Sequence, residues 1–549
     1  RNVAIGQAAL DANTTACDNT AVGKSALGAN TTGNRNTSLG SCSLKTNTTG
    51  VNNVASGFQS MNLNTTGSRN VAYGYSSLGS NTTGNCNTAI GCGSLGGNTT
   101  ASNNTAVGFD SLKANTTGTQ NTATGYKALC KNTTADFNTA YGSAALRENQ
   151  TGTLNVAIGH AALRVTTSDN NTGIGSCALY NNTTGACNVA MGIDSLKTNT
   201  TASFNTAVGI RSMCLNTIGC QNTALGNDSL QANTEGNLNT AVGSASMLGN
   251  TTGDNNVAMG KNALRCNTTA SNNLAIGCGA LCANTTGAQN VAIGRAALSL
   301  NTTASNNTAV GDEALKVSTA SNNVAVGTAA LLVNTTGTGN TLVGWQAGRR
   351  ITTGNGNVAV GCCILAYNTT GALNTAAGQG SLICTTTGSS NTAFGNAAGY
   401  NISTGNGNVV IGRDAGRGGF SPFGITTESN RVVIGTDDIT NAYIQVAWTV
   451  TSDLRDKTEI ENVPHGLAFV DKLKPVSFKF KKSREDDTPH GTKHYGFLAQ
   501  DILELEGDNN VIIDNEQPEK LKYKGEHLVP VLVNAIKELK ARIEVLENE

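Results

Sequence analysis

Residues 19–33 read NTAVGKSALGANTTG, and variants of this phrase recur along most of the chain. The opening five letters return in related form seventeen residues later at 36–40, then at 53–57 and 70–74, and they are still present at 408–412. A fixed period of this length is the signature of a repeat architecture in which each unit stacks on the next. The repeat therefore decides the fold class.

The period has few exceptions. Two steps shrink to sixteen residues, ending at Asn171 and Asn323, and we expect each loss to fall in a loop. An irregular last copy at 430–435 follows a longer insertion that contains Pro422. Counted from Asn2, the chain holds about twenty-six copies.

Each part of the repeat has a local preference. The segment 19–22 alternates and is β-branched, which favours a short strand. Gly23 permits a sharp bend, and Ala26 with Leu27 forms a second small apolar contact. Residues 30–33 are turn residues, in which Asn and Gly tolerate positive φ. Two short strands and two turns would make one coil of a parallel β-solenoid.

One such coil carries too few apolar side chains to fold alone, so each must bury its apolar face against the next. The supply is thin even for a solenoid, and we therefore expect three chains to share one core. A monomeric β-helix is the alternative, and it usually needs larger inward residues. The sequence favours a mainly β homotrimer.

The phrase Asn-[Thr/Val]-Ala-[Val/Ile]-Gly-x-x-Ala-Leu resembles the head repeats of trimeric autotransporter adhesins, a left-handed parallel β-roll made by three chains. Its seventeen-residue form with Asn-Thr-Thr-Gly turns is similar to repeats in phage and large-virus tail fibres. The resemblance covers residues 1–435 and implies a fibre shaft.

Composition sets limits on function. The net charge is zero and the repeats have no basic stripe, so nucleic-acid binding has no electrostatic footprint. No apolar run reaches the length that spans a bilayer, which predicts no membrane insertion. None of the fifteen cysteines lies in a CxxC pair, and we expect no metal and no cofactor. The first residues already lie inside a repeat, so we expect an attachment region before them.

Three signals within the repeats have competing interpretations. Asn-Thr-Thr matches the N-glycosylation acceptor, but turn and ladder roles are favoured. Stacked threonines raise an ice-binding hypothesis, which adjacent threonines on opposite faces disfavour. The cysteines stand where small apolar residues stand in other copies, which predicts buried free thiols. A disulfide between Cys266 and Cys282, one coil apart, is the minority alternative.

Composition changes near residue 436. All six prolines follow residue 421, and all fifteen cysteines precede residue 385. Residues 452–457 read SDLRDK, 473–480 read LKPVSFKF and 494–500 read HYGFLAQ. These blocks resemble the C-terminal intramolecular chaperone and auto-peptidase domain of phage endosialidase tail spikes, shared with other phage fibres and with myelin-regulatory-factor-type transcription factors.

This resemblance implies self-cleavage between Thr451 and Ser452, with Ser452 as the nucleophile and Lys457 as its base. A serine hydroxyl needs such a base, and a lysine serves only where burial or nearby cations lower its pKa. Arg455 is expected to help. Without the resemblance, Ser452 would simply cap a turn and Lys457 would be a solvated surface residue. For His494 an auxiliary acid–base role and a packing role both stay open, with packing favoured.

A helix is expected from Pro530. Its apolar residues follow the 4-3-4-3 spacing of a coiled-coil seam, and three such helices would clamp three chains. Such a clamp fixes register, because shaft coils that resemble one another slip easily. The seam consists of Leu532, Ile536, Leu539, Ile543 and Leu546.

The sequence thus predicts three parts. Residues 1–435 form the shaft, 436–451 a connecting strand in which Trp448 caps the shaft core, and 452–549 a small α+β chaperone domain. The expected function is a phage or virus tail fibre, in the virion or outside the cell, that binds a host-cell receptor or glycan. Its only enzymatic activity would be a single-turnover cleavage of itself. A bacterial cell-surface trimeric adhesin is the alternative, and a polysaccharide-degrading tail spike a third possibility.

Overall fold

The computed structural model describes residues 1–439, 442–445, 450–481, 484–508 and 510–548. The chain divides into two compact units, Arg1–Thr353 and Gly354–Glu549. The first unit consists of repeats, and the second holds the last repeats together with the C-terminal segment.

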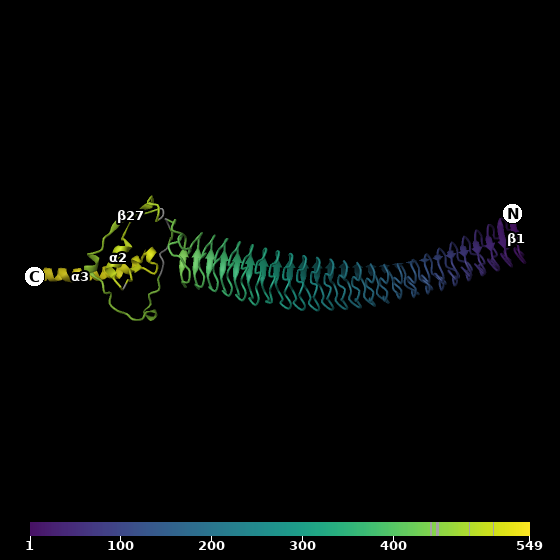
Figure 1. The fold of residues 1–549 in the computed structure, drawn as a ribbon, viewed down its shortest axis with the longest axis horizontal. Helices are drawn as coiled ribbons and strands as arrows, with labels where there is room; N and C mark the ends of the chain where they lie inside the picture. The colour runs from purple at the N-terminus through teal and green to yellow at the C-terminus, as the bar shows by residue number, and fades with distance from the viewer. Residues whose placement is uncertain (440–441, 446–449, 482–483, 509, 549) are drawn as a thin grey trace. The chain divides into compact units, whose positions relative to one another are not determined.

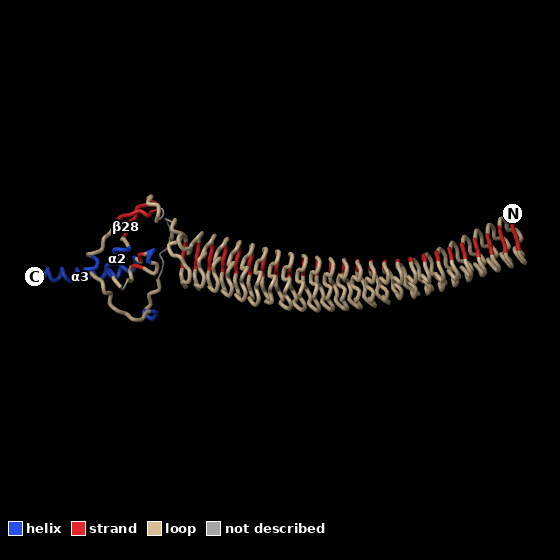
Figure 2. The backbone as a smooth tube through the Cα atoms, in the orientation of Figure 1, coloured by secondary structure: helices blue, strands red, loops and turns tan. Residues whose placement is uncertain are grey.

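Each coil of the first unit contributes one short strand, and consecutive strands pair in parallel (Figure 2). Val54 pairs with Val71 and Ala55 with Ala72, one repeat later. Figure 1 shows the coils of this unit stacked one upon the next. The strands are β1 (Asn2–Ile5), β2 (Asn19–Val22), β3 (Thr37–Leu39), β4 (Val54–Ser56), β5 (Val71–Tyr73), β6 (Thr88–Ile90), β7 (Thr105–Val107), β8 (Thr122–Thr124), β9 (Thr139–Tyr141), β10 (Val156–Ile158), β11 (Thr172–Ile174), β12 (Val189–Met191), β13 (Thr206–Val208), β14 (Thr223–Leu225), β15 (Thr240–Val242), β16 (Val257–Met259), β17 (Leu274–Ile276), β18 (Val291–Ile293), β19 (Thr308–Val310), β20 (Val324–Val326) and β21 (Thr341–Val343).

The predicted parallel β-solenoid and its seventeen-residue period are confirmed. The two short steps keep the strand register, since Val156 pairs with Thr172 and Thr308 with Val324. The missing residue is therefore absorbed outside the strands, as expected.

The prediction of a second strand in each coil is wrong. Ser25 and Leu27 take left-handed conformations, with φ of 57° and 49°, which no β-strand contains. Their N–H groups point to opposite neighbours, from Ser25 to the Gln7 carbonyl of the coil before and from Leu27 to the Ser43 carbonyl of the coil after. A left-handed residue costs roughly 1–2 kcal/mol, and complete burial of a leucine contributes about 1.5–3 kcal/mol. Burial of Leu27 thus offsets its strain.

The glycine that follows each strand is required for two reasons. Gly23 has a φ of 131°, a conformation that side chains rarely adopt, and the same holds at this position in coil after coil. A Cβ atom on Gly23 would also lie 2.6 Å from the carbonyl of Gly40 in the next coil. Close stacking of the coils therefore depends on this glycine.

The core of the coils lies within a single chain. Ala21, Ala26 and Leu27 are completely buried, and equivalent residues repeat this in nearly every coil. The reason for expecting a core shared by three chains was the thin apolar supply. Because the coils are small and their backbones lie close together, one chain buries these apolar side chains without a second chain. The thin apolar supply is therefore no longer a reason to expect a trimer.

Buried asparagines supply the rest of the core. The side-chain amide of Asn47 donates to Asn30 Oδ1 of the preceding coil (2.8 Å) and to the carbonyl of Gly50 (3.0 Å). In a second ladder, the backbone N–H of Asn36 donates to Asn19 Oδ1 (2.9 Å). These side chains are fully buried, or nearly so, and a buried amide costs little when its donors and acceptors are satisfied.

The asparagine ladder decides how Asn-Thr-Thr is read. Asn30 is 0% exposed, so a glycan could not be attached to it in the folded shaft. The turn and ladder interpretation is confirmed, although Asn30 does not take the positive φ that we expected. Thr31 donates its hydroxyl to the Thr48 carbonyl of the next coil (3.1 Å), which occupies a hydroxyl that an ice-binding array would present to water.

The prediction of buried cysteines is wrong. All fifteen thiols are free and none is buried; six are exposed and the others half-buried. Cys130, for example, comes directly after the completely buried Ala128 and Leu129 and is itself only half-buried. Cys266 and Cys282 contact each other through the backbone, with an N–H to carbonyl bond of 3.0 Å, and form no disulfide.

The second unit begins with five more coils. Val409 of the fourth strand pairs with Val432 of the fifth, so the last coil carries an insertion of six residues relative to the seventeen-residue period. The strands are β22 (Val358–Val360), β23 (Thr375–Ala377), β24 (Thr392–Phe394), β25 (Val409–Ile411) and β26 (Val432–Ile434). Arg431, and not Asn430, stands at the ladder position of this coil, since its N–H donates to Asn408 Oδ1 (2.9 Å).

A small α+β segment follows, as predicted. Its core comprises Phe469, Ile502, Ile512, Ile513, Leu528 and Val531. Two antiparallel strand pairs, β27 with β28 and β29 with β30, accompany three α-helices. The elements are η1 (Leu454–Asp456), α1 (Leu467–Val470), β27 (Val476–Lys481), β28 (Pro489–Gly496), α2 (Ala499–Glu506), β29 (Ile513–Asp514), η2 (Pro518–Lys520), β30 (Lys522–Tyr523), η3 (Gly525–His527) and α3 (Leu528–Asn548).

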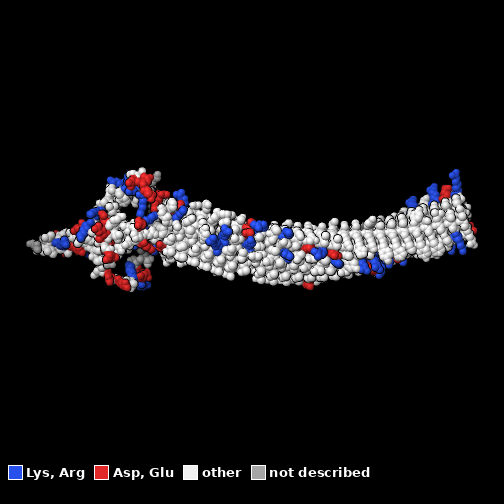
Figure 3. All heavy atoms as spheres, viewed as in Figure 1, with Lys and Arg blue, Asp and Glu red and all other residues white. Residues whose placement is uncertain are grey.

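Charge separates the two kinds of sequence. On the face drawn in Figure 3, charged side chains are sparse over the coils and dense over the C-terminal segment. Of the helices that the structure describes, none combines the length and the apolar character needed to cross a bilayer. Trp448 lies outside the described residues, so its capping role and the connecting strand at 436–451 stay predictions.

Candidate self-cleavage site and assembly surfaces

The candidate site is built around the one-turn helix η1. Asp453 caps it, accepting the backbone N–H of Arg455 at 2.9 Å. The turn closes where the N–H of Lys457 donates to the carbonyl of Leu454 (3.2 Å). An aspartate at this position satisfies a donor that the helix leaves free. The cap therefore folds the chain back between Ser452 and Lys457.

The turn brings the two predicted catalytic side chains together. Lys457 Nζ lies 2.6 Å from Ser452 Oγ, within hydrogen-bond distance. As an ammonium, Lys457 donates to the hydroxyl. As a neutral amine it would accept the hydroxyl proton, which is the direction that a general base needs.

Water surrounds this site in the single chain. Thr451, Ser452 and Lys457 are all exposed. The guanidinium of Arg455, which we expected to assist Lys457, instead pairs with Asp453 at 2.6 Å. That ion pair, together with the Arg455 backbone N–H, holds the pKa of the Asp453 carboxyl below its usual value. Arg455 thus fixes the turn and does not face Lys457.

His494 lies in a packing environment. Its ring stacks on Phe478 with centroids 5.9 Å apart and meets Phe480 edge-on at 5.4 Å. These contacts join β27 to β28. They fit the packing role that the sequence favoured for this histidine.

Helix α3 has two different faces. Leu528, Val531 and Ala535 are buried within the C-terminal segment. The helix begins two residues before Pro530, which falls in the first turn, where a missing N–H costs little. The seam residues have no such cover: Leu532, Ile536, Leu539, Ile543 and Leu546 are 38–70% exposed.

The coils carry a second exposed apolar row. Within a strand the middle residue, usually alanine, faces inward, and the third residue faces outward. The sequence analysis did not distinguish the two faces of the strand and so missed this row. Its most exposed members in the first unit include Ile5, Leu39, Tyr73, Ile90, Tyr141, Ile158, Met191, Leu225 and Met259.

Two further residues escaped the sequence analysis. Glu506 is only 7% exposed and accepts backbone N–H groups from Val511, Ile512 and Ile513 at 2.6–2.9 Å. Arg431 leaves the asparagine ladder and pairs with Glu516. Within the described ranges, no three His, Cys, Asp or Glu side chains are grouped to hold a metal ion.

Comparison with known families identifies the C-terminal segment. Residues 452–511 match the family model described as chaperone of endosialidase, and the match begins at Ser452. The comparison with curated proteins gave no match to the chain. A match of this kind after a long parallel β-solenoid fits a tail-fibre-like protein with an endosialidase-type chaperone domain.

Proposed function

We propose that the chain is a homotrimeric host-adhesion fibre whose C-terminal domain templates assembly and is severed by self-cleavage between Thr451 and Ser452. The observation that carries the cleavage is the 2.6 Å contact between Lys457 Nζ and Ser452 Oγ. This contact lies at the first residue of the family match. Virion attachment and receptor binding follow from the resemblance to tail fibres.

The position of the nucleophile determines the chemistry. Ser452 supplies the amide nitrogen of the scissile bond as well as the attacking Oγ. Lys457 takes the hydroxyl proton as Oγ attacks the Thr451 carbonyl carbon. The C–N bond then breaks, the freed Ser452 amino group takes a proton, and an ester joins Thr451 to Oγ. Water hydrolyses the ester, which leaves a carboxylate on Thr451 and restores the hydroxyl.

The exposed site explains why cleavage would follow assembly. In water a lysine side chain is protonated at neutral pH and cannot accept the serine proton. A second chain packed over η1 would remove water and favour the neutral amine. Leu454, between the two dyad residues in the chain, and Ile460, three residues after Lys457, are 70% and 66% exposed and give such a chain an apolar surface.

Two surfaces support a trimer. The seam of α3 has coiled-coil spacing and no cover, and helices of this kind associate by burying the seam. The outward row on the strands adds apolar area along the coils. Single exposed apolar residues are ordinary, but a contiguous row marks an interaction surface.

The mass of the expressed chain tests the cleavage. Wild type should yield fragments 1–451 and 452–549, and Ser452→Ala should stay at full length. Sedimentation of both should give three chains per particle. An intact wild-type chain under all folding conditions would remove the peptidase proposal, and a monomer in both cases would remove the trimer.

A further inference from the structure

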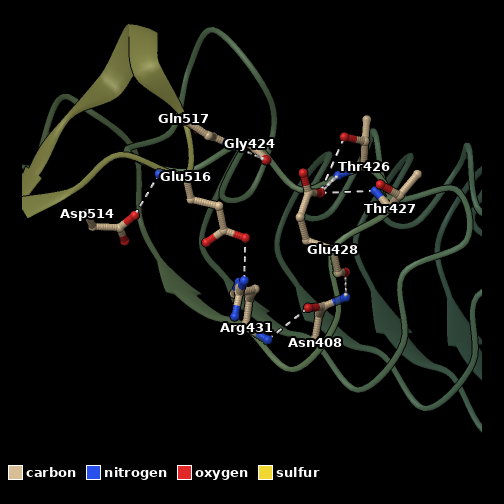
Figure 4. Close-up of polar contacts among 9 residues, drawn as sticks. All are labelled: Asn408, Gly424, Thr426, Thr427, Glu428, Arg431, Asp514, Glu516 and Gln517. Carbon is tan, nitrogen blue, oxygen red and sulfur yellow. Dashed lines mark hydrogen bonds and ion pairs between the residues drawn. The ribbon is translucent and has the colours of Figure 1, made fainter. Parts of the chain in front are cut away.

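The last coil carries a docking surface for the C-terminal segment (Figure 4). At the ladder position, asparagine gives way to Arg431, which cannot continue the row of amides. Its backbone N–H still bonds Asn408, while its guanidinium reaches out to the carboxylate of Glu516. The side chain at the last ladder position thus contacts Glu516, 85 residues later in the chain, while asparagines at the other ladder positions contact neighbouring coils.

A second group of contacts lies beside it. Lys520 Nζ donates to the carbonyl of Ser421 and lies 3.1 Å from a carboxylate oxygen of Asp437. The side-chain amide of Gln517 donates to the carbonyl of Gly424 (2.6 Å). The Lys520 side chain is only 21% exposed, so this ion pair is shielded from water on one side.

An aromatic ring lies at the centre of the surface. Phe423, in the insertion of the last coil, is 7% exposed. Lys522 Nζ lies over its ring at 3.7 Å from the centroid, and the Arg431 guanidinium carbon lies at 5.8 Å. Cation–π contacts of this kind strengthen when they are desolvated. Burial lowers the pKa of Lys522, in keeping with a desolvated amine.

All of these contacts span the proposed cut. Ser421, Phe423, Gly424, Arg431 and Asp437 precede Thr451, whereas Glu516, Gln517, Lys520 and Lys522 follow Ser452. We propose that this surface retains the severed C-terminal domain on the last coil, so that cleavage and release are separate steps. The partner that it fits is the chain's own shaft end.

The charges make release sensitive to ionic strength. Two ion pairs and two cation–π contacts carry the charges of this surface, and the side chains of both ion pairs are 21–48% exposed. Screening shortens from about 10 Å at 0.1 M salt to about 3 Å at 1 M. The domain should therefore stay bound in dilute buffer and leave faster in concentrated salt.

This inference rests on the proposed cleavage, and its test must not depend on it. A Ser452→Ala chain with a site-specific protease sequence in place of the exposed residues 457–462 tests retention of the domain independently of self-cleavage. The added protease cuts this chain whether or not the protein cleaves itself. Size-exclusion chromatography of the nicked protein then shows whether the N-terminal and C-terminal fragments elute together.

In about 0.1 M salt the two fragments should elute together. Glu516→Lys should raise the rate of release by about tenfold or more, since it opposes two like charges. Adding Arg431→Glu reverses the pair and should restore retention. Glu526→Lys, the same charge change at an exposed residue, is the matched control and should retain the domain.

Two results would overturn the inference. One is immediate separation of the nicked parent protein in dilute buffer. The other is equal retention by Glu516→Lys and Glu526→Lys. A wild-type chain that never cleaves itself would instead contradict the proposed function and leave this measurement intact.

Discussion

The coils and the C-terminal segment both bury polar side chains, but the hydrogen-bond partners of these side chains differ between the two regions. In the coils, Asn250 donates to Asn233 of the coil before (2.8 Å) and accepts from Asn267 of the coil after (2.8 Å). In the C-terminal segment, Glu506 accepts the N–H groups of Val511, Ile512 and Ile513, an arrangement that is not repeated among the residues that the structure describes. A coil displaced by one repeat finds the same partners, whereas Glu506 has one set.

This difference indicates that the coils and the C-terminal segment contribute differently to folding. Repeated contacts add stability with every coil but do not distinguish one register from the next. Unique contacts fix a single arrangement. This difference is consistent with the proposal that the C-terminal domain supplies the reference for register during assembly of the shaft.

The largest effect concerns the chemistry of the unique part. Ser452→Ala and Lys457→Met should each slow cleavage by roughly 10³-fold or more, because nucleophile and base act as a unit. The appearance of fragment 1–451 over time, followed by mass spectrometry, measures this rate. Lys472→Met, which removes another exposed lysine of the same domain, should leave it unchanged. Equal rates in all three variants would contradict the dyad.

The next effect separates unique from repeated polar contacts. Glu506→Gln places a donating amide against three buried N–H groups and should destabilise the C-terminal segment by about 3–4 kcal/mol. Urea unfolding followed by a probe in that segment measures the change. Glu504→Gln, at an exposed position on the same helix, is the control. Similar losses for both would mean that Glu506 is not structurally required.

In the coils, Asn250→Ala removes three hydrogen bonds and leaves the buried Asn233 Oδ1 without its donor. We expect a local loss of about 2–3 kcal/mol. Hydrogen exchange of the coils on either side measures it, because a solenoid opens locally and unfolding there spreads only to neighbours. Thr252→Ala, at an exposed threonine of the same turn, should change stability by less than about 0.5 kcal/mol.

Thiol reactivity reports on the coils alone, because all fifteen cysteines precede residue 385. Burial, with the Cys362 thiol 3.3 Å away, raises the pKa of the Cys363 thiol to about 11. Alkylation needs the thiolate, so at neutral pH Cys363 should react about tenfold more slowly than an ordinary exposed thiol. Its rate should rise with pH up to about 11. Peptide-level labelling with Cys362→Ser as the comparison measures this, since that variant removes one cause of the shift.

The smallest expected effect comes from deleting one whole repeat, and it tests most directly whether the coils are interchangeable. Deletion of residues 223–239 removes one whole repeat and joins Asn222 to Thr240, which recreates the Asn-Thr step. The stability of the remaining coils should change by less than about 0.5 kcal/mol. Deletion of about half a coil at the same place should unfold the coils around it. Thermal unfolding by circular dichroism compares the two.

Much of the fold could be predicted because the repeat is read directly from the sequence. The strand positions and the sixteen-residue steps follow from periodicity, whereas the α+β segment was expected from the family resemblance. The second strand was wrong because Ala26 and Leu27 were taken as a small apolar strand, whereas both are buried in a turn in which Ser25 and Leu27 are left-handed. Apolar character alone does not distinguish these backbones.

The candidate site was predicted in part. Resemblance indicated Ser452 and Lys457, and the cap at Asp453 gives the physical reason for their contact. Arg431 was missed because aligning the last copy on Asn430 places the ladder one residue too early. The role of Glu506 depends on a loop whose path no local pattern predicts.

The most direct test of this division is to break the seam of α3 and leave the shaft untouched. Ile536→Asp with Ile543→Asp puts charges at two exposed seam positions that the C-terminal core does not use. Sedimentation and mass should show that both the three-chain particle and fragment 1–451 are lost. A particle of three chains with normal cleavage in this variant would contradict the claim that the C-terminal domain directs assembly.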